Sequence, residues 1–148
     1  MRLPDLLSQG SLKKDVKAGT MLRTGIDLIE IGRFKSAVER HGERLLKRVF
    51  TERELEEVGH NTASLAARFA AKEAVAKALG TGIGLVGWRD MEILRGEMRE
   101  PVLDLHGAAR RLANELGLEE WAISLSHTHD YALAVAVALK KESWGADQ

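Results

Sequence analysis

The chain has 148 residues, of which 45% are hydrophobic and 30% are charged, and this composition is typical of one soluble domain with a single sizeable core. Its 22 lysine and arginine residues balance 22 acidic residues, so no overall charge indicates a nucleic-acid or membrane partner, and charge recognition must come from local patches. The chain contains no cysteine, which excludes disulfides, thiolate catalysis and cysteine-based zinc sites and is compatible with a cytoplasmic protein.

Residues 1–20 have no strong periodicity and no long apolar core of the kind that signal peptides carry. We interpret them as a mobile extension or a start-site artefact ahead of Met21, and we predict a single domain over residues 21–148. No uncharged apolar run reaches the roughly 20 residues that span a bilayer. The sequence therefore predicts a soluble protein with no membrane partner.

The first half of the domain begins with a strand and continues with helices. Residues 24–31 are β-branched and apolar apart from two acids, which predicts a buried strand interrupted by Asp27. Residues 33–49 predict a helix that Gly42 breaks or kinks. Thr51 and Glu54 have the spacing of a capping box, which predicts the start of a short acidic helix over residues 51–58.

A longer helix is predicted over residues 65–79, and glycines of the GTGIG segment end it and allow backbone to approach a ligand. Residues 90–94 and 102–105 predict a hairpin, and residues 107–117 predict a helix closed by Gly117. Residues 122–128 and 131–139 alternate as an antiparallel pair. One face of the last strand carries only alanines, which suits close packing of a helix or another subunit.

These elements do not alternate regularly between strand and helix, so a doubly wound parallel sheet is not expected. We predict an α+β fold in which an antiparallel sheet packs against helices.

The helix at residues 65–79 carries four charges among its alanines. On a helical wheel, Glu73 and Lys77 lie along one border of the apolar stripe, Arg68 lies along the other, and Lys72 lies inside it. A solvated Glu73–Lys77 pair is the simplest interpretation and would stabilise the helix by about 0.2 to 0.5 kcal/mol. Lys72 needs an anion, a route for its ammonium to solvent, or a subunit boundary.

Two further residues are candidates for chemistry. Asp27, on a buried strand, could share a cation with Glu73, because two carboxylates with waters and a substrate phosphate describe a typical magnesium site. It could equally be capped by backbone N–H groups or paired with a lysine. His127 ends an apolar row and could contact a phosphate or move a proton, although a lone histidine is more often a satisfied core residue. A zinc site with His129 has no evident third ligand.

The segment 33–48 carries six basic residues and two acidic ones in a nearly neutral chain. On a wheel, several of them form a basic stripe beside hydrophobic side chains, which suits an acidic amphipathic helix or a phosphate backbone. An ordinary solvated face is the alternative, and a break at Gly42 would scatter the stripe. Single-stranded nucleic acid is poorly supported, because no aromatic residues are interleaved with the charges.

Six segments, taken in order, resemble the holo-acyl-carrier-protein synthases, the small type of 4′-phosphopantetheinyl transferase. They are GIDLIEIGRF, FTERELEE, RFAAKEAVAKALGTG, WRDMEIL, PVLDLHG and SLSHTHDYALAVAVA. The similarity runs from about residue 25 to residue 139. It implies a magnesium-dependent enzyme that moves phosphopantetheine from coenzyme A to a serine of acyl carrier protein and releases 3′,5′-ADP, and it implies a homotrimer with active sites between subunits.

The resemblance also implies roles for individual residues. Asp27 and Glu73 match the metal ligands, Lys77 the lysine one turn later, and His127 the strand histidine. The basic helix that docks the carrier falls at Arg33, Arg40, Arg44 and Arg48. An assembly of this kind would also account for Lys72 and for the alanine face of the last strand.

The chemistry of phosphoryl transfer, which depends on positioning and charge neutralisation, suggests the remaining roles. We hypothesise that Glu73, directly or through a bound water, takes the serine proton, while Lys77 and Arg68 balance charge on the leaving diphosphate. The predicted coenzyme-binding set is Arg68, Lys77, Gly80, Thr81, Gly82, His127 and Thr128. The alternatives are a non-enzymatic binding module with structural Asp27 and Glu73, and a related transferase with broader carrier choice.

Overall fold

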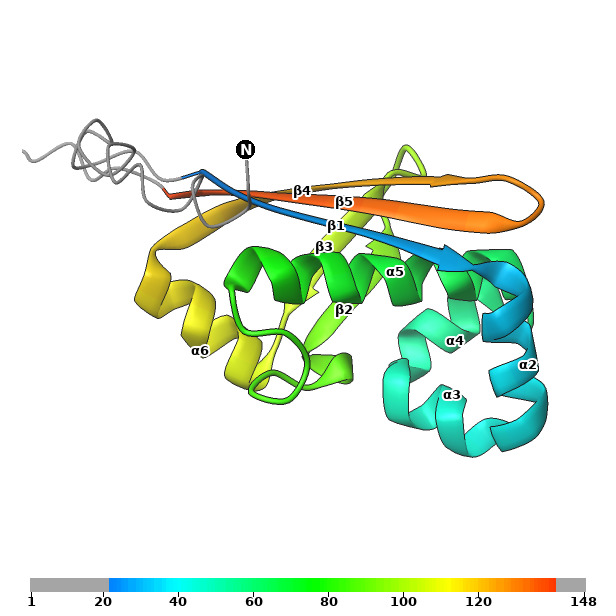
Figure 1. Cartoon of the computed structure of the whole chain (residues 1–148). Helices are drawn as coiled ribbons and strands as arrows, with labels where there is room; N and C mark the ends of the chain where they lie inside the picture. The colour runs from blue at the N-terminus through cyan, green and yellow to red at the C-terminus, as the bar shows by residue number, and fades with distance from the viewer. Residues whose placement is uncertain (1–21, 141–148) are drawn as a thin grey trace, which may run out of the picture.

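A three-stranded antiparallel sheet forms one layer of the molecule (Figure 1). The structure, a computed structural model, describes residues 22–140, and its sheet has the order β1 (Leu22–Glu30), β5 (Tyr131–Lys140) and β4 (Leu118–His127). The predicted antiparallel pair at residues 122–128 and 131–139 is confirmed, and β4 begins four residues earlier than expected, with a register shift between Leu118 and Glu120. The predictions for residues 1–20 and Met21 lie outside the described residues.

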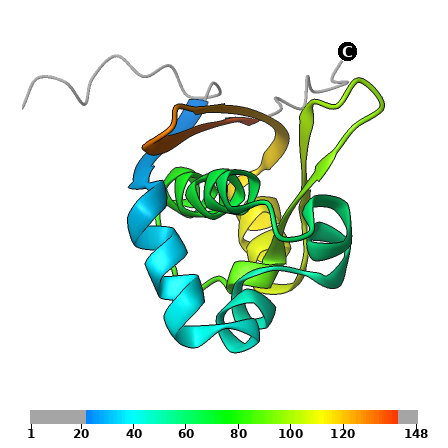
Figure 2. The same ribbon diagram turned by 90° about the vertical axis from the view of Figure 1, so that its right-hand side faces the viewer.

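Helix α5 (Thr62–Leu79) runs beneath this sheet and is the centre of the molecule (Figures 1 and 2). It begins three residues before the predicted start, because the Asn61 side chain accepts a hydrogen bond from the Ser64 N–H and caps the helix. The alanines of β5 are fully buried on the face that meets α5. Of the two predicted alternatives for this alanine face, a packed helix is confirmed, and the account by a subunit assembly is wrong because α5 of the same chain covers the face.

Gly25 is the point of closest approach between β1 and α5. A Cβ atom added at Gly25 would lie 1.8 Å from the carbonyl oxygen of Ala74, so only glycine fits there. This contact holds the strand that carries Asp27 directly against the helix that carries Glu73.

The outer face of the sheet is covered by no helix or strand of the described chain (Figure 1). Ile26 and Leu28 are 57% and 60% exposed, and Leu22 and Leu139 are also exposed there. The prediction that the first strand is buried is therefore wrong for one of its two faces, because β1 packs on α5 only through its other face.

Four short segments pack around α5 on the side away from the sheet (Figure 2). The predicted helix over residues 33–49 is two helices, α2 (Ile31–His41) and α3 (Glu43–Val49), and the break falls at Gly42, whose φ is 59°. The capping box of α4 (Glu52–Val58) is confirmed, since Thr51 and Glu54 exchange both hydrogen bonds. A single 3-10 turn, η1 (Trp88–Asp90), leads into the hairpin.

The remaining elements are the hairpin of β2 (Met91–Arg95) and β3 (Pro101–Leu105) and the helix α6 (Gly107–Leu116), which Gly117 ends as predicted. Two hydrophobic clusters, one along the sheet and one under α2 and α3, share Ile29 and Leu125 at their border. The α+β prediction is confirmed. Within residues 22–140, no helix is long and apolar enough to cross a membrane.

Candidate functional site

The structure brings Asp27, Glu73 and Lys77 together where β1 crosses α5. Lys77 Nζ donates hydrogen bonds to the carbonyl oxygen of Ile26 at 2.8 Å and to Asp27 Oδ1 at 3.3 Å. Glu73 lies one turn before Lys77 on the same side of α5. The open interpretation of Glu73 and Lys77 as a solvated pair is too simple, because the partner of Lys77 comes from a strand 50 residues away in sequence.

The electrostatics of this trio leave negative charge to be neutralised. Burial, and then the charge of Asp27, raise the pKa of the Glu73 carboxyl, while Lys77 acts in the opposite direction. A single lysine that is itself half exposed does not offset two neighbouring carboxylates. Two neighbouring carboxylates with one lysine beside them are a donor set that fits a divalent cation.

The glycine turn after α5 adjoins Lys77 directly. Gly80 and Gly82 have φ values of 83° and 65°, and the backbone N–H groups of Gly80, Thr81 and Gly82 all point back to the carbonyl oxygen of Ala76. Thr81 Oγ1 donates to the carbonyl oxygen of Gly82. The three predicted nucleotide-binding residues therefore form one tight turn at the same end of the helix as Lys77.

The structure does not bring His127 to this trio within one chain. His127 pairs with Ala132 of β5, and Asp27 pairs with Ala134 of the same strand, so two strand spacings and a two-residue offset separate them. This places the two residues more than about 10 Å apart. Thr128 shapes the β4–β5 turn, where its hydroxyl accepts from the N–H groups of Asp130 and Tyr131.

For Lys72, the structure confirms the first of the three predicted alternatives, a partner anion. Its side chain is 0% exposed, and its ammonium donates to Glu54 Oε1 at 2.7 Å and to the carbonyl oxygens of Met91 and Trp88. Burial lowers the pKa of Lys72, and the charge of Glu54 opposes that shift. The partner is an anion of the same chain, so the proposal that a subunit boundary accounts for Lys72 is wrong.

Arg68 has a similar partner on the same side of α5. It is 4% exposed, and it donates to Glu57 Oε2 at 2.7 Å and to the carbonyl oxygen of Ile93 at 3.1 Å. The guanidinium is thus engaged away from Asp27 and Glu73, and its role in coenzyme binding stays a prediction. Sequence reasoning missed Glu54 and Glu57 as partners. A signal was present, because Glu54 and Glu57 are three residues apart and Arg68 and Lys72 are four apart, and either spacing places two side chains on one face of a helix.

The basic residues predicted to dock a carrier divide between two helices. Arg33 and Arg40 line one shallow surface pocket of about 510 Å³ along α2. Arg33 also lines an adjacent apolar pocket of about 400 Å³ together with Phe34, Leu45 and Phe69. Arg44 and Arg48 are exposed on α3, beyond the break at Gly42. The predicted basic stripe of Arg33, Arg40, Arg44 and Lys47 is therefore divided between two helices, as the alternative of a break at Gly42 anticipated.

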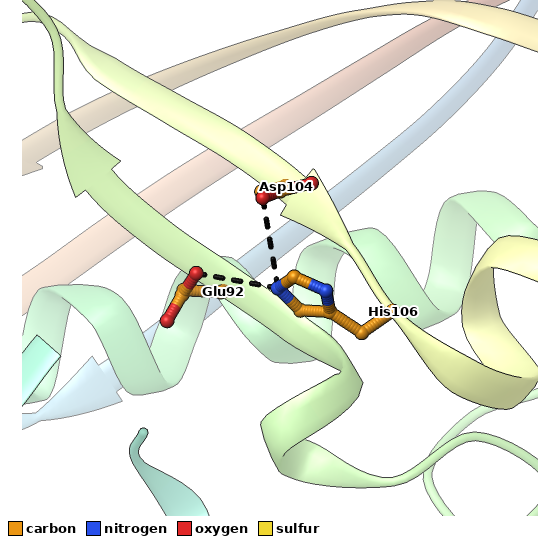
Figure 3. Close-up of side chains that lie close together, drawn as sticks. All are labelled: Glu92, Asp104 and His106. Atoms are coloured by element: carbon orange, nitrogen blue, oxygen red, sulfur yellow. Dashed lines mark hydrogen bonds and ion pairs between the residues drawn. The ribbon is translucent and has the colours of Figure 1, made fainter. Parts of the chain in front are cut away.

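A separate polar cluster lies on the β2–β3 hairpin and was not predicted (Figure 3). Glu92 and Asp104 are directly opposed across the hairpin, and His106 Nε2 lies 3.2 Å from Glu92 Oε1 and 3.7 Å from Asp104 Oδ2. Like charges directly opposed destabilise a sheet. Arg53 on Glu92 and Arg110 on Asp104 supply the compensating charge, so this cluster is an ion-pair network.

Comparison with known proteins gives a consistent set of relatives. Residues 23–136 match the family model described as ACPS, the 4′-phosphopantetheinyl transferase superfamily. The chain is 48% identical over 126 residues to a holo-[acyl-carrier-protein] synthase of Herpetosiphon aurantiacus, covering 80% of this chain and 99% of that protein. It is 54% identical over 120 residues to one of Moorella thermoacetica, covering 79% and 93%.

A solved structure extends this similarity to the fold. The Helicobacter pylori holo-[acyl-carrier-protein] synthase in complex with coenzyme A superposes with a TM-score of 0.72 at 29% identity, covering 78% of this chain and 98% of that one.

Proposed function

The chain belongs to the 4′-phosphopantetheinyl transferase superfamily, among the holo-[acyl-carrier-protein] synthases, and from this premise we propose that Asp27, Glu73 and Lys77 form its catalytic centre. As a member of this family it is a transferase that moves phosphopantetheine from coenzyme A to acyl carrier protein, a step that serves fatty acid synthesis. The observation that carries the proposal is the meeting of two carboxylates and a lysine at the β1–α5 crossing.

In the proposed mechanism, the serine hydroxyl of the carrier attacks the phosphorus that bears the pantetheine arm. The new serine–phosphate bond forms as the bond to 3′,5′-ADP breaks. Glu73, directly or through a bound water, accepts the serine proton. Lys77 places a positive charge beside the diphosphate and stabilises the negative charge of the departing ADP. The turn at Gly80, Thr81 and Gly82 offers backbone that can lie close to the nucleotide.

Magnesium is the cation proposed for this centre, and Asp27 and Glu73 would hold it. When bound, Mg²⁺ neutralises charge on the diphosphate of coenzyme A and orients it for in-line transfer. The raised pKa of Glu73 beside the charge of Asp27 supports the assignment, since a divalent cation relieves that repulsion.

We place the carrier on α2 and α3. An acidic carrier, which the family resemblance implies, would find complementary charge in the exposed arginines Arg33, Arg40, Arg44 and Arg48. The apolar pocket that Phe34, Leu45 and Phe69 line beside Arg33 would accept a hydrophobic side chain of that partner.

A homotrimer with active sites between subunits is part of the same proposal. Two features support it: the uncovered apolar face of β1 and β5, and the distance that separates His127 and Thr128 from Asp27 within one chain. In such an assembly, His127 and Thr128 of one subunit would reach the coenzyme held by its neighbour. The cytoplasm, where coenzyme A is available, is the proposed location.

Intact-protein mass spectrometry of an apo acyl carrier protein, incubated with this protein and coenzyme A, tests these assignments. We expect a mass gain of one phosphopantetheine with Mg²⁺ and none with a chelator. Asp27→Asn and Glu73→Gln should each lower the rate by at least about a hundredfold in folded protein. Near-normal transfer by either variant would contradict the metal assignment, and metal-independent carrier binding without transfer would favour the binding module.

A further inference from the structure

Hydrophobicity alone does not determine which side of α5 faces β1. The helix is apolar nearly all round, and most of its buried residues are alanines that present similar small surfaces in every direction. A helix of this kind can rotate or slide against its neighbours at little cost in buried apolar area. The direction in which Glu73 and Lys77 point must therefore be fixed by other contacts.

The Lys72–Glu54 pair supplies the first of these contacts, on a different side of α5 from the proposed centre. Both side chains are 0% exposed. Lys72 Nζ donates to the carbonyl oxygen of Met91 at 2.7 Å, and Glu54 Oε2 accepts from the N–H of Ile93 at 3.2 Å. The pair thus bonds to two backbone groups of β2 in addition to itself.

The Arg68–Glu57 pair repeats this arrangement one step along the same strand. Arg68 Nε donates to the carbonyl oxygen of Ile93, and Glu57 accepts from the N–H of Arg95 at 2.9 Å. Together the two pairs satisfy alternating N–H and C=O groups on the edge of β2 that β3 leaves unpaired, as a neighbouring strand would do. We call these four side chains the edge ladder.

The edge ladder and the proposed centre are rigidly linked through α5. Lys72 and Glu73 are consecutive residues, so their side chains leave the helix about 100° apart. Any rotation of α5 that moves Glu73 away from β1 also withdraws Lys72 from Glu54 and from the edge of β2. A buried ion pair is by itself weak evidence for stability, because apolar replacements of similar volume are often as stable. The contribution of the Lys72–Glu54 pair is to orient α5.

We propose that the edge ladder, and above all the Lys72–Glu54 pair, is a positioning device that sets the rotation of α5 and so presents Glu73 and Lys77 to Asp27. This inference rests on the proposed function of that trio. Lys72 and Glu54 are fully buried beside β2, and the pair acts through the helix that carries Glu73.

The test compares the wild-type protein with Lys72→Met, which keeps an unbranched, slightly shorter side chain and removes the ammonium. Folding is checked by thermal unfolding, Mg²⁺ binding in the presence of coenzyme A is measured by calorimetry, and kcat and KM are measured with apo carrier. We expect Mg²⁺ binding and kcat to fall by about tenfold to a hundredfold, as when outer contacts of a metal site are lost. The KM for the carrier should stay within about twofold, because the docking arginines lie on other helices.

Two further variants separate positioning from stability. Val58→Ala removes a buried side chain of α4 that takes no part in the ladder, and it should lower the melting temperature while Mg²⁺ binding and kcat stay unchanged. Should Lys72→Met fail to fold, Glu57→Gln is used instead, because it weakens the edge ladder at a side chain that is only partly buried. We expect Mg²⁺ binding and kcat to fall by about threefold in this variant.

Wild-type Mg²⁺ binding and kcat in a folded Lys72→Met, or in Glu57→Gln with lowered stability, would overturn the proposal and leave the ladder a stabilising feature only. A wild-type protein that binds no Mg²⁺ with coenzyme A present would contradict the metal assignment instead. In that case a lower kcat in Lys72→Met, with the KM for the carrier unchanged, still tests whether the edge ladder positions Glu73.

Discussion

At the scale of single residues, the site depends on a glycine as much as on charged groups. Asp27 can meet Glu73 and Lys77 only because Gly25, two residues earlier on the same face of β1, lets the strand lie against the backbone of α5. The spacing of two residues places both on one side of the strand. Close approach and catalytic geometry are therefore consequences of the same short segment.

Gly25→Ala tests this dependence. The added methyl group would overlap the carbonyl oxygen of Ala74, so β1 must move away from α5, and we expect a loss of about 3 kcal/mol in the free energy of unfolding together with lower transfer activity. Urea unfolding measures the first effect. Gly32→Ala on α2 is the matched control, because nothing lies within 4 Å of the added atom, and it should stay within about 1 kcal/mol of wild type. Equal stabilities for the two variants would refute the close contact.

Glu73 should trade stability for activity. Because its folded pKa is raised, the ionised carboxylate destabilises the metal-free folded state at neutral pH, and this cost disappears as the pH falls through the folded pKa. Glu73→Gln should therefore unfold at a higher temperature than wild type in chelator at pH 7, while losing transfer activity. The difference in melting temperature should vanish in acid. A less stable variant at pH 7 would show that Asp27 and burial do not disfavour the charge.

At the scale of elements, two short segments determine how α5 is held. Helix α4 presents Glu54 and Glu57 to the buried side of α5, and the hairpin of β2 and β3 presents the backbone groups that those carboxylates also bind. The same hairpin is tied to α4 a second time through Glu92, which accepts hydrogen bonds from Thr51 and Arg53. The acidic helix predicted from TERELEEV is thus a connector between the hairpin and the central helix.

Stability should depend on pH through Glu92. Burial alone would raise its pKa, but hydrogen bonds from Thr51 and His106 and the charge of Arg53 outweigh burial and hold the pKa below its ordinary value of 4.5. The ionised group therefore stabilises the fold above pH 4.5, and this contribution is lost as the pH falls through the lower folded pKa. We expect Glu92→Gln to cost about 2 kcal/mol at pH 7.

Urea unfolding of wild type and Glu92→Gln checks the direction of this pH dependence. The pH is varied from 7 to about 3.5, roughly the range in which carboxyl groups titrate. The difference in the free energy of unfolding between wild type and Glu92→Gln should narrow steadily as the pH falls below the ordinary pKa. A gap that widens in acid would mean that burial, and not the hydrogen bonds, dominates at Glu92.

At the scale of the whole molecule, the outer face of the sheet is apolar and is covered by no helix or strand of the described residues. Exposed apolar side chains of β1 lie beside partly buried ones of β5, with Ile26 opposite Val135 and Leu28 opposite Leu133. Contiguous apolar surface of this kind marks an interaction site. The proposed trimer would bury it and would bring His127 of one subunit to the centre of another.

Ile26→Arg should prevent this assembly, because a charge would be buried in the centre of the interface. We expect size-exclusion chromatography with light scattering to show a trimer for wild type and a monomer with little transfer activity for the variant. Met98→Arg at the exposed hairpin tip is the control and should assemble as wild type does. A wild-type monomer with full activity would show that one chain holds a complete site.

Features that depend on neighbours along the chain could be predicted from the amino-acid sequence. The capping box at Thr51, the break at Gly42, the helix end at Gly80 and the alternation of β5 all follow from local hydrogen bonding, from backbone conformations that only glycine adopts easily, and from the two-residue period of a strand. These features established the order of elements and the α+β class. The resemblance to a family supplied the expected site residues.

Only the tertiary structure decided which distant groups meet. The sequence placed Lys72 in an apolar stripe, but its partner Glu54 lies 18 residues earlier, on another helix. The clash that excludes a Cβ at Gly25 and the exposure of one face of β1 likewise depend on which elements pack together. The residues next to a charge or a small side chain do not reveal its partner, because a buried ion pair or a close contact involves two segments that are distant in sequence.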